Sequence, residues 1–580
     1  MQSSRADKPN RIRIVSIGAS AFFLAAFASQ AWVQTFGAGG IQRKADKTER
    51  FVLNIPDAPK RGTIRSADGV VLARDDEQYA LNIDFAKVPR SDGFYIDLGE
   101  AIGASGEEIR SYAKAGKKVT WPATLKSDAK KRLTEVKKKW RADGVSAASS
   151  GNRMYPMGES ASAIVGLFGN AATAKGIEKE FSKLIVGKPG KMRGLVDRTG
   201  AVLPMRMEER TPRVDGADIE LTIDSNLQRV AFESLKRAVE KHRAESGVAI
   251  VMNPKTGDIL AMANWPTFDP RTGQGPDGEP ADVNPAVMSR WEPGSTMKVL
   301  TQAKAIEDGV IDSGWRLMCN GVLQRGKYKI SCDLHGGTRA HGAVNMEKAI
   351  AASCNVSAAT WAMGIGYEPY RQFVEDLGLL DRLDVGLPSA TSGEIPPNNV
   401  ARTHDLMCWG FGQSMAVTPL ALGAAFSAIG NDGLWMRPRL VKSIGGKENP
   451  VREGKLVFSP KTTRQIIPYM EAVFESDRGT ANSLRIPGHL IAGKTGTAQR
   501  MGRGRGNVSN FVGLVPSQEP KAMILVMVDH PTRGGIYGSV VAGPVFKDIA
   551  EAVIRKYQLH PASGTQKSMP KPDVEVQVQR

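Results

Sequence analysis

The sequence is poor in cysteine and in aromatic residues: its 580 residues include 4 cysteines, and Phe, Trp and Tyr together make up 6%. Four cysteines are too few for a small disulfide-rich scaffold. The 41% of hydrophobic and 24% of charged residues exclude a collagen-like chain and a largely disordered one. No internal repeat is present, and at roughly 150 residues per domain the length predicts about three or four structural units.

Acidic residues are also scarce relative to basic ones. The 78 Lys and Arg against 60 Asp and Glu give a formal net charge of +18, which favours anionic surroundings such as nucleic acid, lipid headgroups or a wall polymer. The densest basic cluster, between Lys130 and Arg141, contains one aromatic residue, Trp140, and no nucleic-acid motif. We therefore interpret it as a solvated helix face rather than a polyanion site, and we expect no nucleic-acid partner.

Charged residues of either sign are absent from Ile14 to Gln42. The apolar part of this segment is about 20 residues long, which is enough for a helix to cross the hydrocarbon core of a membrane. Arg11 and Arg13 precede it, and basic residues prefer the cytoplasmic side. We predict a cytoplasmic tail over residues 1–13 and a single-pass anchor over 14–36 in the inner membrane, with the rest of the chain on the periplasmic side.

Two other interpretations of this apolar segment are open. Ala26-Phe27-Ala28 fits the small-x-small pattern of a cleaved signal peptide. A buried helix of a soluble domain would also be apolar, although a basic flank followed by a long uncharged run suits it poorly. No second uncharged run of this length follows, so one membrane span is the preferred prediction.

The rest of the chain divides where its composition changes. Short apolar runs alternate with Lys-rich helical patches up to about residue 217, and recurrent Gly and Pro there favour several small subdomains. A helix over 225–244 and a strand hairpin over 247–263 follow, and two strands and a helix come late, at 510–528 and 544–557. Strands at both ends of a mostly helical middle predict one α+β domain. The expected ranges are 37–54 for a juxtamembrane linker, 55–217 for the N-terminal module, 218–557 for the α+β domain and 558–580 for a disordered tail.

The sharpest chemical motif is Ser295-Thr-Met-Lys298, which follows a Pro-Gly turn. Ser295 would open a helix, with Lys298 one turn later on the same face. A free serine is a poor nucleophile, so a neighbouring base must take its proton. Lysine can do so only if its surroundings lower its pKa from about 10.4.

A Ser-x-x-Lys motif alone is weak, because it also occurs at Ser111–Lys114 and Ser127–Lys130 among polar residues. The order of three motifs along the chain makes the signal specific. The nucleophile motif at Ser295 is followed by Ser353-Cys354-Asn355 and then by Lys494-Thr495-Gly496-Thr497, which can form an edge strand. Lys494 and the two threonine hydroxyls would bind a carboxylate. Gly493 and Gly496 would let a substrate backbone approach closely. These three motifs in this order are typical of active-site-serine penicillin-recognising enzymes.

Metal binding has little support in the sequence. His335, His341 and His530 lack metal-ligand spacing and are interpreted as residues of Gly-rich turns. Cys354 is interpreted as a small buried packing residue. Trp265, Tyr328 and Trp409 are assigned to the core or to a cleft wall.

With these motifs the chain resembles the class B penicillin-binding proteins, the monofunctional peptidoglycan D,D-transpeptidases. Arg61–Ala73, Arg153–Pro156 and Arg193–Arg198 are similar to motifs of the family's non-catalytic N-terminal region. Tyr537–Phe546 is most similar to the septal, division-type branch. The resemblance implies a penicillin-binding transpeptidase fold, with an antiparallel sheet, helices on its faces and a helical subdomain. An elongated N-terminal pedestal of the dimerisation type and one transmembrane helix would precede it.

The resemblance also implies a mechanism. Ser295, deprotonated by Lys298, would attack the penultimate D-Ala carbonyl of a peptidoglycan stem peptide ending in D-Ala-D-Ala, and an amine would resolve the acyl-enzyme. Ser353 and Asn355 would complete the proton network; Lys494, Thr495, Gly496 and Thr497 would complete the site. No metal or organic cofactor would be needed. The implied partners are β-lactams bound covalently at Ser295, a polytopic membrane glycosyltransferase and divisome proteins.

Two other functions fit the same motifs. A serine β-lactamase shares them but needs fast deacylation and usually lacks so long an N-terminal module. A scaffold or β-lactam sensor would bind without turnover, and the N-terminal module would then be its working part.

A last expectation is a disulfide between Cys319 and Cys332. The residues between them have partly alternating apolar positions around Gly326, which predicts a short hairpin with the two cysteines nearly opposite. Export would permit oxidation, and similar cysteines occur in relatives of the family. Two free buried thiols are the alternative. Cys354 and Cys408 have no obvious partner and are expected to stay reduced.

Overall fold

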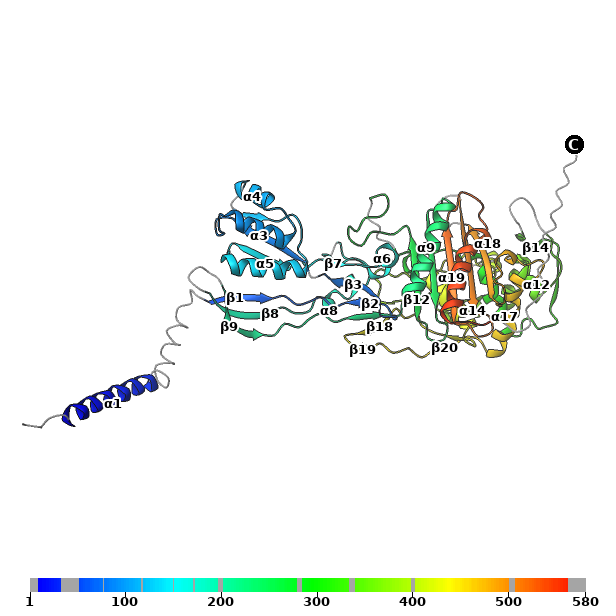
Figure 1. Cartoon of the computed structure of the whole chain (residues 1–580). Helices are drawn as coiled ribbons and strands as arrows, with labels where there is room; N and C mark the ends of the chain where they lie inside the picture. The colour runs from blue at the N-terminus through cyan, green and yellow to red at the C-terminus, as the bar shows by residue number, and fades with distance from the viewer. Residues whose placement is uncertain are drawn as a thin grey trace, which may run out of the picture.

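The computed structural model describes residues 9–32, 52–76, 78–115, 118–149, 151–170, 173–196, 202–278, 284–332, 340–397, 402–499 and 506–561. Figure 1 shows an elongated molecule, with helix α1 at one end, a strand-rich module in the middle and a large α+β domain at the other end. The 558–580 tail and the 37–54 linker fall mostly outside the described residues, as does His335.

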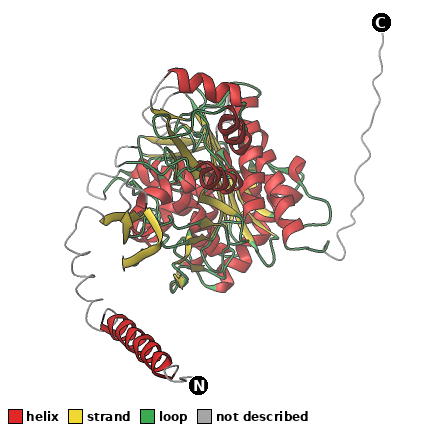
Figure 2. Cartoon of the chain, turned by 60° about the vertical axis from the view of Figure 1, so that its left-hand side comes forward, coloured by secondary structure: helices red, strands yellow, loops and turns green. Residues whose placement is uncertain are grey.

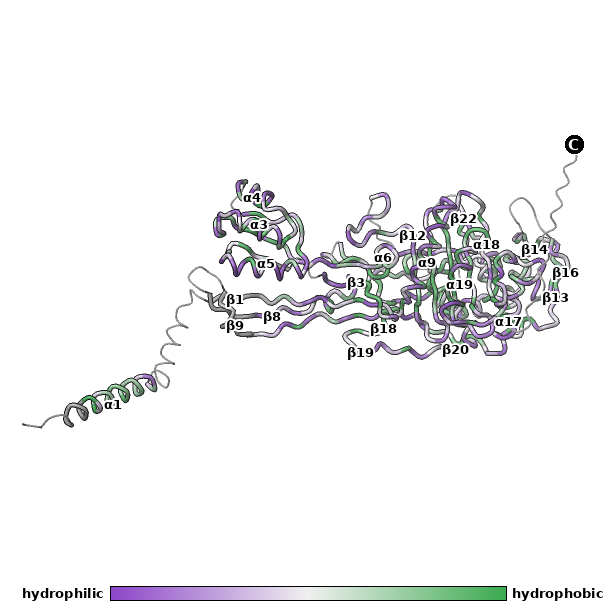
Figure 3. The backbone as a smooth tube through the Cα atoms, viewed as in Figure 1, coloured by the Kyte–Doolittle hydropathy of each residue, from purple (hydrophilic) through white to green (hydrophobic). Residues whose placement is uncertain are grey.

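Helix α1 covers Pro9–Trp32 and stands apart from the rest of the fold. Its segment Val15–Trp32 has a mean hydropathy of 1.4 and no buried residue, and it is long and apolar enough to cross a membrane. Figure 3 shows the hydrophobic residues along this helix. Among the residues that the structure describes, none covers these apolar side chains, which disfavours a buried soluble helix as the interpretation of α1.

The N-terminal module consists of small sheets, as its composition predicts. One helical lobe has its own core, which centres on Phe94, Leu98 and Leu133. The chain forms two helices between Asp92 and Ala115, because Gly103 adopts φ 76° and ends the first of them. The elements of the lobe are α3 (Asp92–Ile102), α4 (Gly106–Ala115), α5 (Ser127–Trp140), β4 (Tyr79–Asp84), β5 (Lys118–Thr120) and β6 (Val145–Ser149).

Two further sheets form the stem of this module. A three-stranded antiparallel sheet has the order β1-β8-β9, and a six-stranded sheet has the order β19-β18-β10-β2-β3-β7. The six-stranded sheet includes β18 and β19 from the C-terminal half, so it ties the stem to the large domain. The strands are β1 (Val52–Asp57), β8 (Gly190–Val196), β9 (Val202–Thr211), β19 (Lys447–Glu448), β18 (Val441–Ile444), β10 (Ile219–Leu221), β2 (Ile64–Arg65), β3 (Val71–Asp75) and β7 (Arg153–Met154).

A buried ion pair between Arg153 and Glu178 stabilises the stem. Arg153 Nε lies 2.7 Å from Glu178 Oε1, and the two side chains are 4% and 0% exposed. Arg153 also donates to the carbonyl of Gly62 and lies 3.2 Å from Asp75. Glu178 belongs to the short helix α7 (Gly176–Glu180), which is flanked by α6 (Glu159–Val165) and α8 (Ser182–Ile185). The Arg153 and Gly176-Ile-Glu178 segments therefore meet in one structural junction.

The large domain is built on a five-stranded antiparallel sheet of order β12-β11-β23-β22-β21. Every residue of β23 is buried, so both faces of the sheet are covered. Helices α9 and α19 pack on the sheet and on each other, and α16 contacts β11 and β23. Figure 2 shows helices gathered around these strands. The elements are β11 (Ser246–Met252), β12 (Ile259–Trp265), β21 (Ala492–Gln499), β22 (Asn507–Val515), β23 (Ala522–Asp529), α9 (Ser225–Lys241), α16 (Pro419–Ile429), α18 (Gly538–Val541) and α19 (Gly543–Lys556).

The expected elements of this domain are confirmed. The Asp224 side chain accepts from the Leu227 N–H and caps α9 at its predicted start. The hairpin over 247–263, the two late strands and the closing helix are β11-β12, β22-β23 and α19. The fold is the mixed α+β arrangement that the resemblance implies.

The middle of the chain forms the helical subdomain, which lies beside the edge strand β21. Its elements are α10 (Pro285–Met288), the 3₁₀ turn η3 (Gly294–Thr296), α11 (Met297–Glu307), β13 (Arg316–Cys319), β14 (Val322–Arg325), β15 (Tyr328–Ser331), β16 (Gly342–Asn345), α12 (Met346–Ala351), α13 (Asn355–Ile365), α14 (Tyr367–Asp376), α15 (Thr403–Trp409), β17 (Leu434–Trp435), β20 (Lys455–Leu456), α17 (Pro460–Glu475) and η4 (Asn482–Leu484).

Candidate active site

The three sequence motifs meet at one cleft between the edge strand β21 and the helical subdomain. The cleft has a volume of about 1010 Å³. Its lining includes Ser295, Lys298, Ser353, Asn355, Thr495, Gly496 and Thr497. Lys494 lies directly beneath it with no exposed surface. The structure thus brings the candidate site residues of all three motifs together at one cleft.

Ser295 lies on the 3₁₀ turn η3, which leads directly into α11. The turn requires φ 58° at Gly294, a conformation that favours glycine. The carbonyl of Pro293 accepts from Thr296 Oγ1 at 2.7 Å and from Asn510 Nδ2 at 3.0 Å. Because Asn510 belongs to β22, the sheet itself holds the nucleophile turn in place.

Lys298 is 1% exposed and faces the second motif. Its Nζ donates to the Ser353 carbonyl at 2.6 Å and to Ser353 Oγ at 2.9 Å. Burial lowers the pKa of Lys298 to about 8, against the opposing influence of Cys332 and Cys354. A hydrogen bond from Lys298 to Ser295 is not among the contacts of the described residues, and such catalytic contacts tighten when substrate binds.

Ser353 and Asn355 flank the start of α13. Ser353 has φ 56°, an unusual conformation for a residue with a side chain, and it turns the chain sharply between α12 and α13. Its hydroxyl consequently faces Lys298. Asn355 Nδ2 donates to the carbonyl of Ser331 at 2.9 Å, which ties the second motif to strand β15.

The third motif forms β21, the edge strand that was expected. Lys494 Nζ lies 3.1 Å from the Thr495 carbonyl and 3.4 Å from Thr495 Oγ1. Burial, and next the positive charge of Lys298, hold the pKa of Lys494 well below its usual value. Thr495 Oγ1 lies 3.0 Å from Thr480 Oγ1, and Thr497 Oγ1 accepts from the Gly538 N–H at 3.3 Å. Both threonine hydroxyls therefore have fixed positions at the cleft.

The two glycines of β21 have a packing role that the sequence did not predict. A Cβ on Gly496 would lie 1.7 Å from Asn510 Oδ1, and a Cβ on Gly493 would lie 2.9 Å from the Val512 carbonyl and 3.1 Å from the Phe474 ring. Packing against the neighbouring strand and α17 thus requires glycine at both positions. Gly496 also lines the cleft, and close approach of a substrate backbone there stays a prediction.

The competing motifs lie elsewhere. Ser111 and Ser127 are on α4 and α5 in the N-terminal module, and Ser111 is exposed. His530 pairs with Glu245 at 3.2 Å. Trp265 and Trp409 are buried, as expected for core residues.

The sequence did not predict three loop residues of the cleft wall, Asp477, Arg478 and Thr480, because they belong to no recognisable motif.

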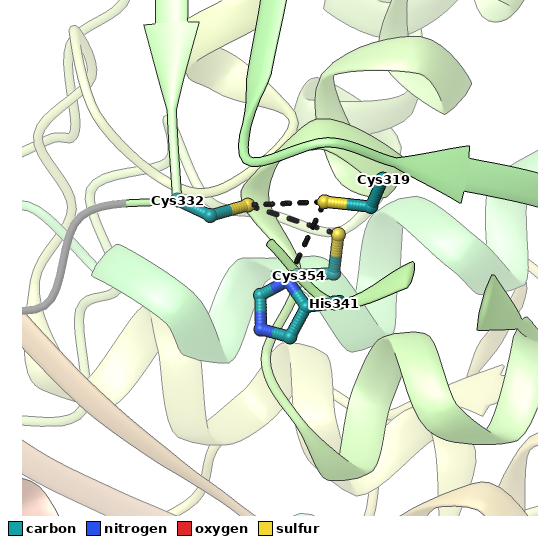
Figure 4. Close-up of side chains that lie close together, drawn as sticks. All are labelled: Cys319, Cys332, His341 and Cys354. Atoms are coloured by element: carbon teal, nitrogen blue, oxygen red, sulfur yellow. Dashed lines mark hydrogen bonds between the residues drawn. The ribbon is translucent and has the colours of Figure 1, made fainter. Parts of the chain in front are cut away.

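The prediction of a Cys319–Cys332 disulfide is wrong. Cys319 and Cys332 are free thiols with Sγ atoms 3.8 Å apart, rather than a disulfide. The hairpin β14-β15 does form, but its register places Cys332 beside Gly321, and Cys319 ends β13, which pairs with β16. Cys354 and Cys408 are free thiols, as expected, although Cys354 Sγ lies 3.8 Å from that of Cys332 (Figure 4).

His341 completes this group, and its Nδ1 lies 3.5 Å from Cys319 Sγ. The expectation that the histidines take no part in a ligand-like cluster is therefore wrong for His341. The group cannot be recognised from the sequence, because its successive members are separated by twelve, eight and twelve residues. Familiar metal-binding motifs contain ligand pairs with much shorter spacings.

Comparison with known proteins agrees with this site. Residues 247–551 match the family model "Penicillin binding protein transpeptidase domain", and residues 56–221 match "Penicillin-binding Protein dimerisation domain". The chain is 28% identical to the "Probable peptidoglycan D,D-transpeptidase PenA" of Neisseria gonorrhoeae, over 93% of this chain and 91% of that protein. It is 26% identical to the "Peptidoglycan D,D-transpeptidase FtsI" of Escherichia coli strain K12, over 92% and 90%.

A solved structure shares the fold. Penicillin binding protein 3 of Mycobacterium tuberculosis, in a crystal structure complexed with aztreonam, superposes with a TM-score of 0.66 at 23% identity. The match covers 88% of this chain and 98% of that one. With the transpeptidase model matching more than half of the chain and the dimerisation model preceding it, this chain belongs to the class B penicillin-binding proteins.

Proposed function

We propose that this protein is a serine-type peptidoglycan D,D-transpeptidase that cross-links stem peptides ending in D-Ala-D-Ala. One observation carries the proposal: a serine on a fixed turn, a buried lysine one helical turn later and a serine hydroxyl 2.9 Å from that lysine line a single cleft. This arrangement supplies a nucleophile, a base and a proton relay. The names of the Neisseria and Escherichia relatives support the same reaction.

The first step forms an acyl-enzyme. Neutral Lys298 takes the proton of Ser295 Oγ as this oxygen attacks the carbonyl carbon of the penultimate D-Ala. The peptide bond to the terminal D-Ala breaks, and the proton passes to its amine through Lys298 and Ser353. The ester on Ser295 remains. Backbone N–H groups of Ser295 and Thr497 stabilise the oxyanion, a device worth about 3–4 kcal/mol.

The second step transfers the acyl group. An amine from a neighbouring stem peptide attacks the ester carbon and forms the cross-link, and Ser295 recovers its proton. The carboxylate of the donor peptide binds to the hydroxyls of Thr495 and Thr497. Lys494, buried beneath them, contacts Thr495 Oγ1 and orients its hydroxyl. A β-lactam imitates D-Ala-D-Ala and stays bound to Ser295 as an ester.

We infer the membrane localisation and topology of the chain from helix α1 and from the proposed reaction. Peptidoglycan lies outside the cytoplasmic membrane, and the basic residues before α1 favour the cytoplasm. We place α1 in the inner membrane as an uncleaved anchor, with the cleft on the periplasmic side. The Tyr537–Phe546 segment and the division-type relatives favour a septal role, with a polytopic glycosyltransferase and divisome proteins as partners.

The test uses the full-length chain with a stem-peptide donor ending in D-Ala-D-Ala and an amine acceptor. We expect release of D-Ala and a cross-linked product from the native chain, none from Ser295→Ala, and normal product from the control Ser111→Ala. A penicillin adduct should last on the order of hours. Loss of the adduct well under a second would indicate a lactamase instead, and a stable adduct without any cross-linked product would indicate a sensor.

A further inference from the structure

Three cysteines and one histidine converge at the wall of the cleft, and the mechanism above uses none of their side chains. They are Cys319, Cys332, His341 and Cys354, and their ligand atoms all lie within 4.8 Å of one another. The three cysteines are buried and His341 is half-buried. Figure 4 shows the three sulfur atoms and the imidazole pointing toward a common centre. We propose that these four residues bind one zinc ion.

Three of the six distances between the ligand atoms match the edges of a tetrahedral site, and the others are at most 4.8 Å. With Zn–S near 2.3 Å and Zn–N near 2.0–2.1 Å, the edges of a tetrahedral site are about 3.8 Å between two sulfurs and about 3.5 Å between sulfur and nitrogen. The Cys319–Cys332 and Cys332–Cys354 sulfur pairs are each 3.8 Å apart, and Cys319 Sγ lies 3.5 Å from His341 Nδ1. A disulfide would need about 2.05 Å.

The chemistry of the ligands selects the metal. Thiolates are soft ligands that favour zinc over magnesium, calcium or manganese. Three cysteines and one histidine form one of the ligand sets of structural zinc sites, in which four protein ligands leave no open position. The site therefore holds the fold and performs no catalysis of its own.

The surroundings of Cys354 suit a metal-bound thiolate. Cys354 is the N-cap of α13, an 11-residue helix whose N-terminus favours negative charge. The Ser357 N–H donates to Cys354 Sγ at 3.4 Å. A thiolate at this position thus has a hydrogen bond that persists when zinc is bound.

The ligands come from segments that must be aligned for the second motif to work. Cys319 ends β13, Cys332 follows β15, His341 precedes β16 and Cys354 is the N-cap residue just before α13. Cys354 lies between Ser353 and Asn355 in sequence. One zinc ion would therefore link the start of α13 to the ends of β13, β15 and β16. This link would hold the Ser353 hydroxyl within hydrogen-bond distance of Lys298. This differs from the expectation that the protein needs no metal.

The test measures zinc in the full-length chain, purified in detergent without chelators or metal-affinity steps. We expect about one zinc per chain in the native protein and in the control Cys408→Ser, whose cysteine lies outside the group, and below about a tenth of that in Cys319→Ser and His341→Ala. Replacement by Co²⁺ should give the thiolate charge-transfer and d–d absorption of a tetrahedral site. Ser295→Ala should keep its zinc, so the result is independent of the proposed activity.

Three outcomes would overturn the proposal. The native chain could contain no zinc and fail to bind added Zn²⁺ after reduction. Thiol counting on the unfolded, unreduced chain could reveal a Cys319–Cys332 disulfide in place of a metal. The two ligand variants could retain as much zinc as the native chain. If a variant does not fold, the zinc content and cobalt spectrum of the native chain still decide the question.

Discussion

The pH dependence of acylation should report the protonation of Lys298. A lysine acts as a base only in its neutral form, so the rate must rise as pH rises through its pKa. Burial lowers that pKa to about 8. The neutral fraction is then about one-tenth at pH 7 and about one-hundredth at pH 6. Acylation by penicillin should therefore be about tenfold slower at pH 6 than at pH 7 and should level off above about pH 9.

The assay follows labelling by a fluorescent penicillin at low concentration from pH 6 to 9.5, with Ser295→Ala as the blank. Lys298→Arg supplies the matched control, because arginine keeps a positive charge but cannot be deprotonated, and it should acylate about 10²–10⁴-fold more slowly at every pH. A rate that still rises tenfold per pH unit at pH 9.5 would mean that burial does not lower this pKa. A flat profile would mean that Lys298 is not the base.

Three further predictions concern the surroundings of the site. Replacing Ser353 by Ala removes the hydroxyl that accepts from the catalytic lysine and should slow penicillin labelling about 10²-fold or more; an equal rate would exclude a relay through this hydroxyl. Gly496→Ala places a methyl group 1.7 Å from Asn510 Oδ1, so it should lower the free energy of unfolding by about 1–3 kcal/mol. The double variant Gly496→Ala/Asn510→Ala removes the clashing side chain and should recover part of this loss. Arg153→Met or Glu178→Gln alone should destabilise the stem by about 3–5 kcal/mol in unfolding measurements, whereas replacing both with apolar residues should cost far less. Additive losses in that double variant would contradict a coupled buried pair.

The sequence predicted the large domain well because its elements carry local signals. Asp224 caps α9 where an N-cap residue precedes a helical pattern, and β11 and β12 are apolar runs around a turn of Asn, Pro and Gly. The three motifs also predicted the cleft, because their order along the chain matches a known arrangement. Local periodicity and motif order thus suffice for most of the fold and for the residues that line the site.

The cysteine group and the packing role of the glycines could not be predicted in this way, because tertiary register decides them. The pairing of β13 with β16 brings His341 toward Cys319, and the hairpin register shifts Cys332 away from the position opposite Cys319. The packing role of Gly496 likewise depends on the side chain of Asn510 on the next strand, which fills the space beside it. Such contacts between paired strands leave no local pattern in the sequence.

The site of the penicillin adduct tests the central claim most directly. The full-length chain is incubated with penicillin, and mass spectrometry of the intact protein and of its peptides locates the modification. The account predicts one adduct per chain, on Ser295 alone, and no adduct in Ser295→Ala. An adduct on Ser111 or Ser127, or undiminished labelling of Ser295→Ala, would contradict it.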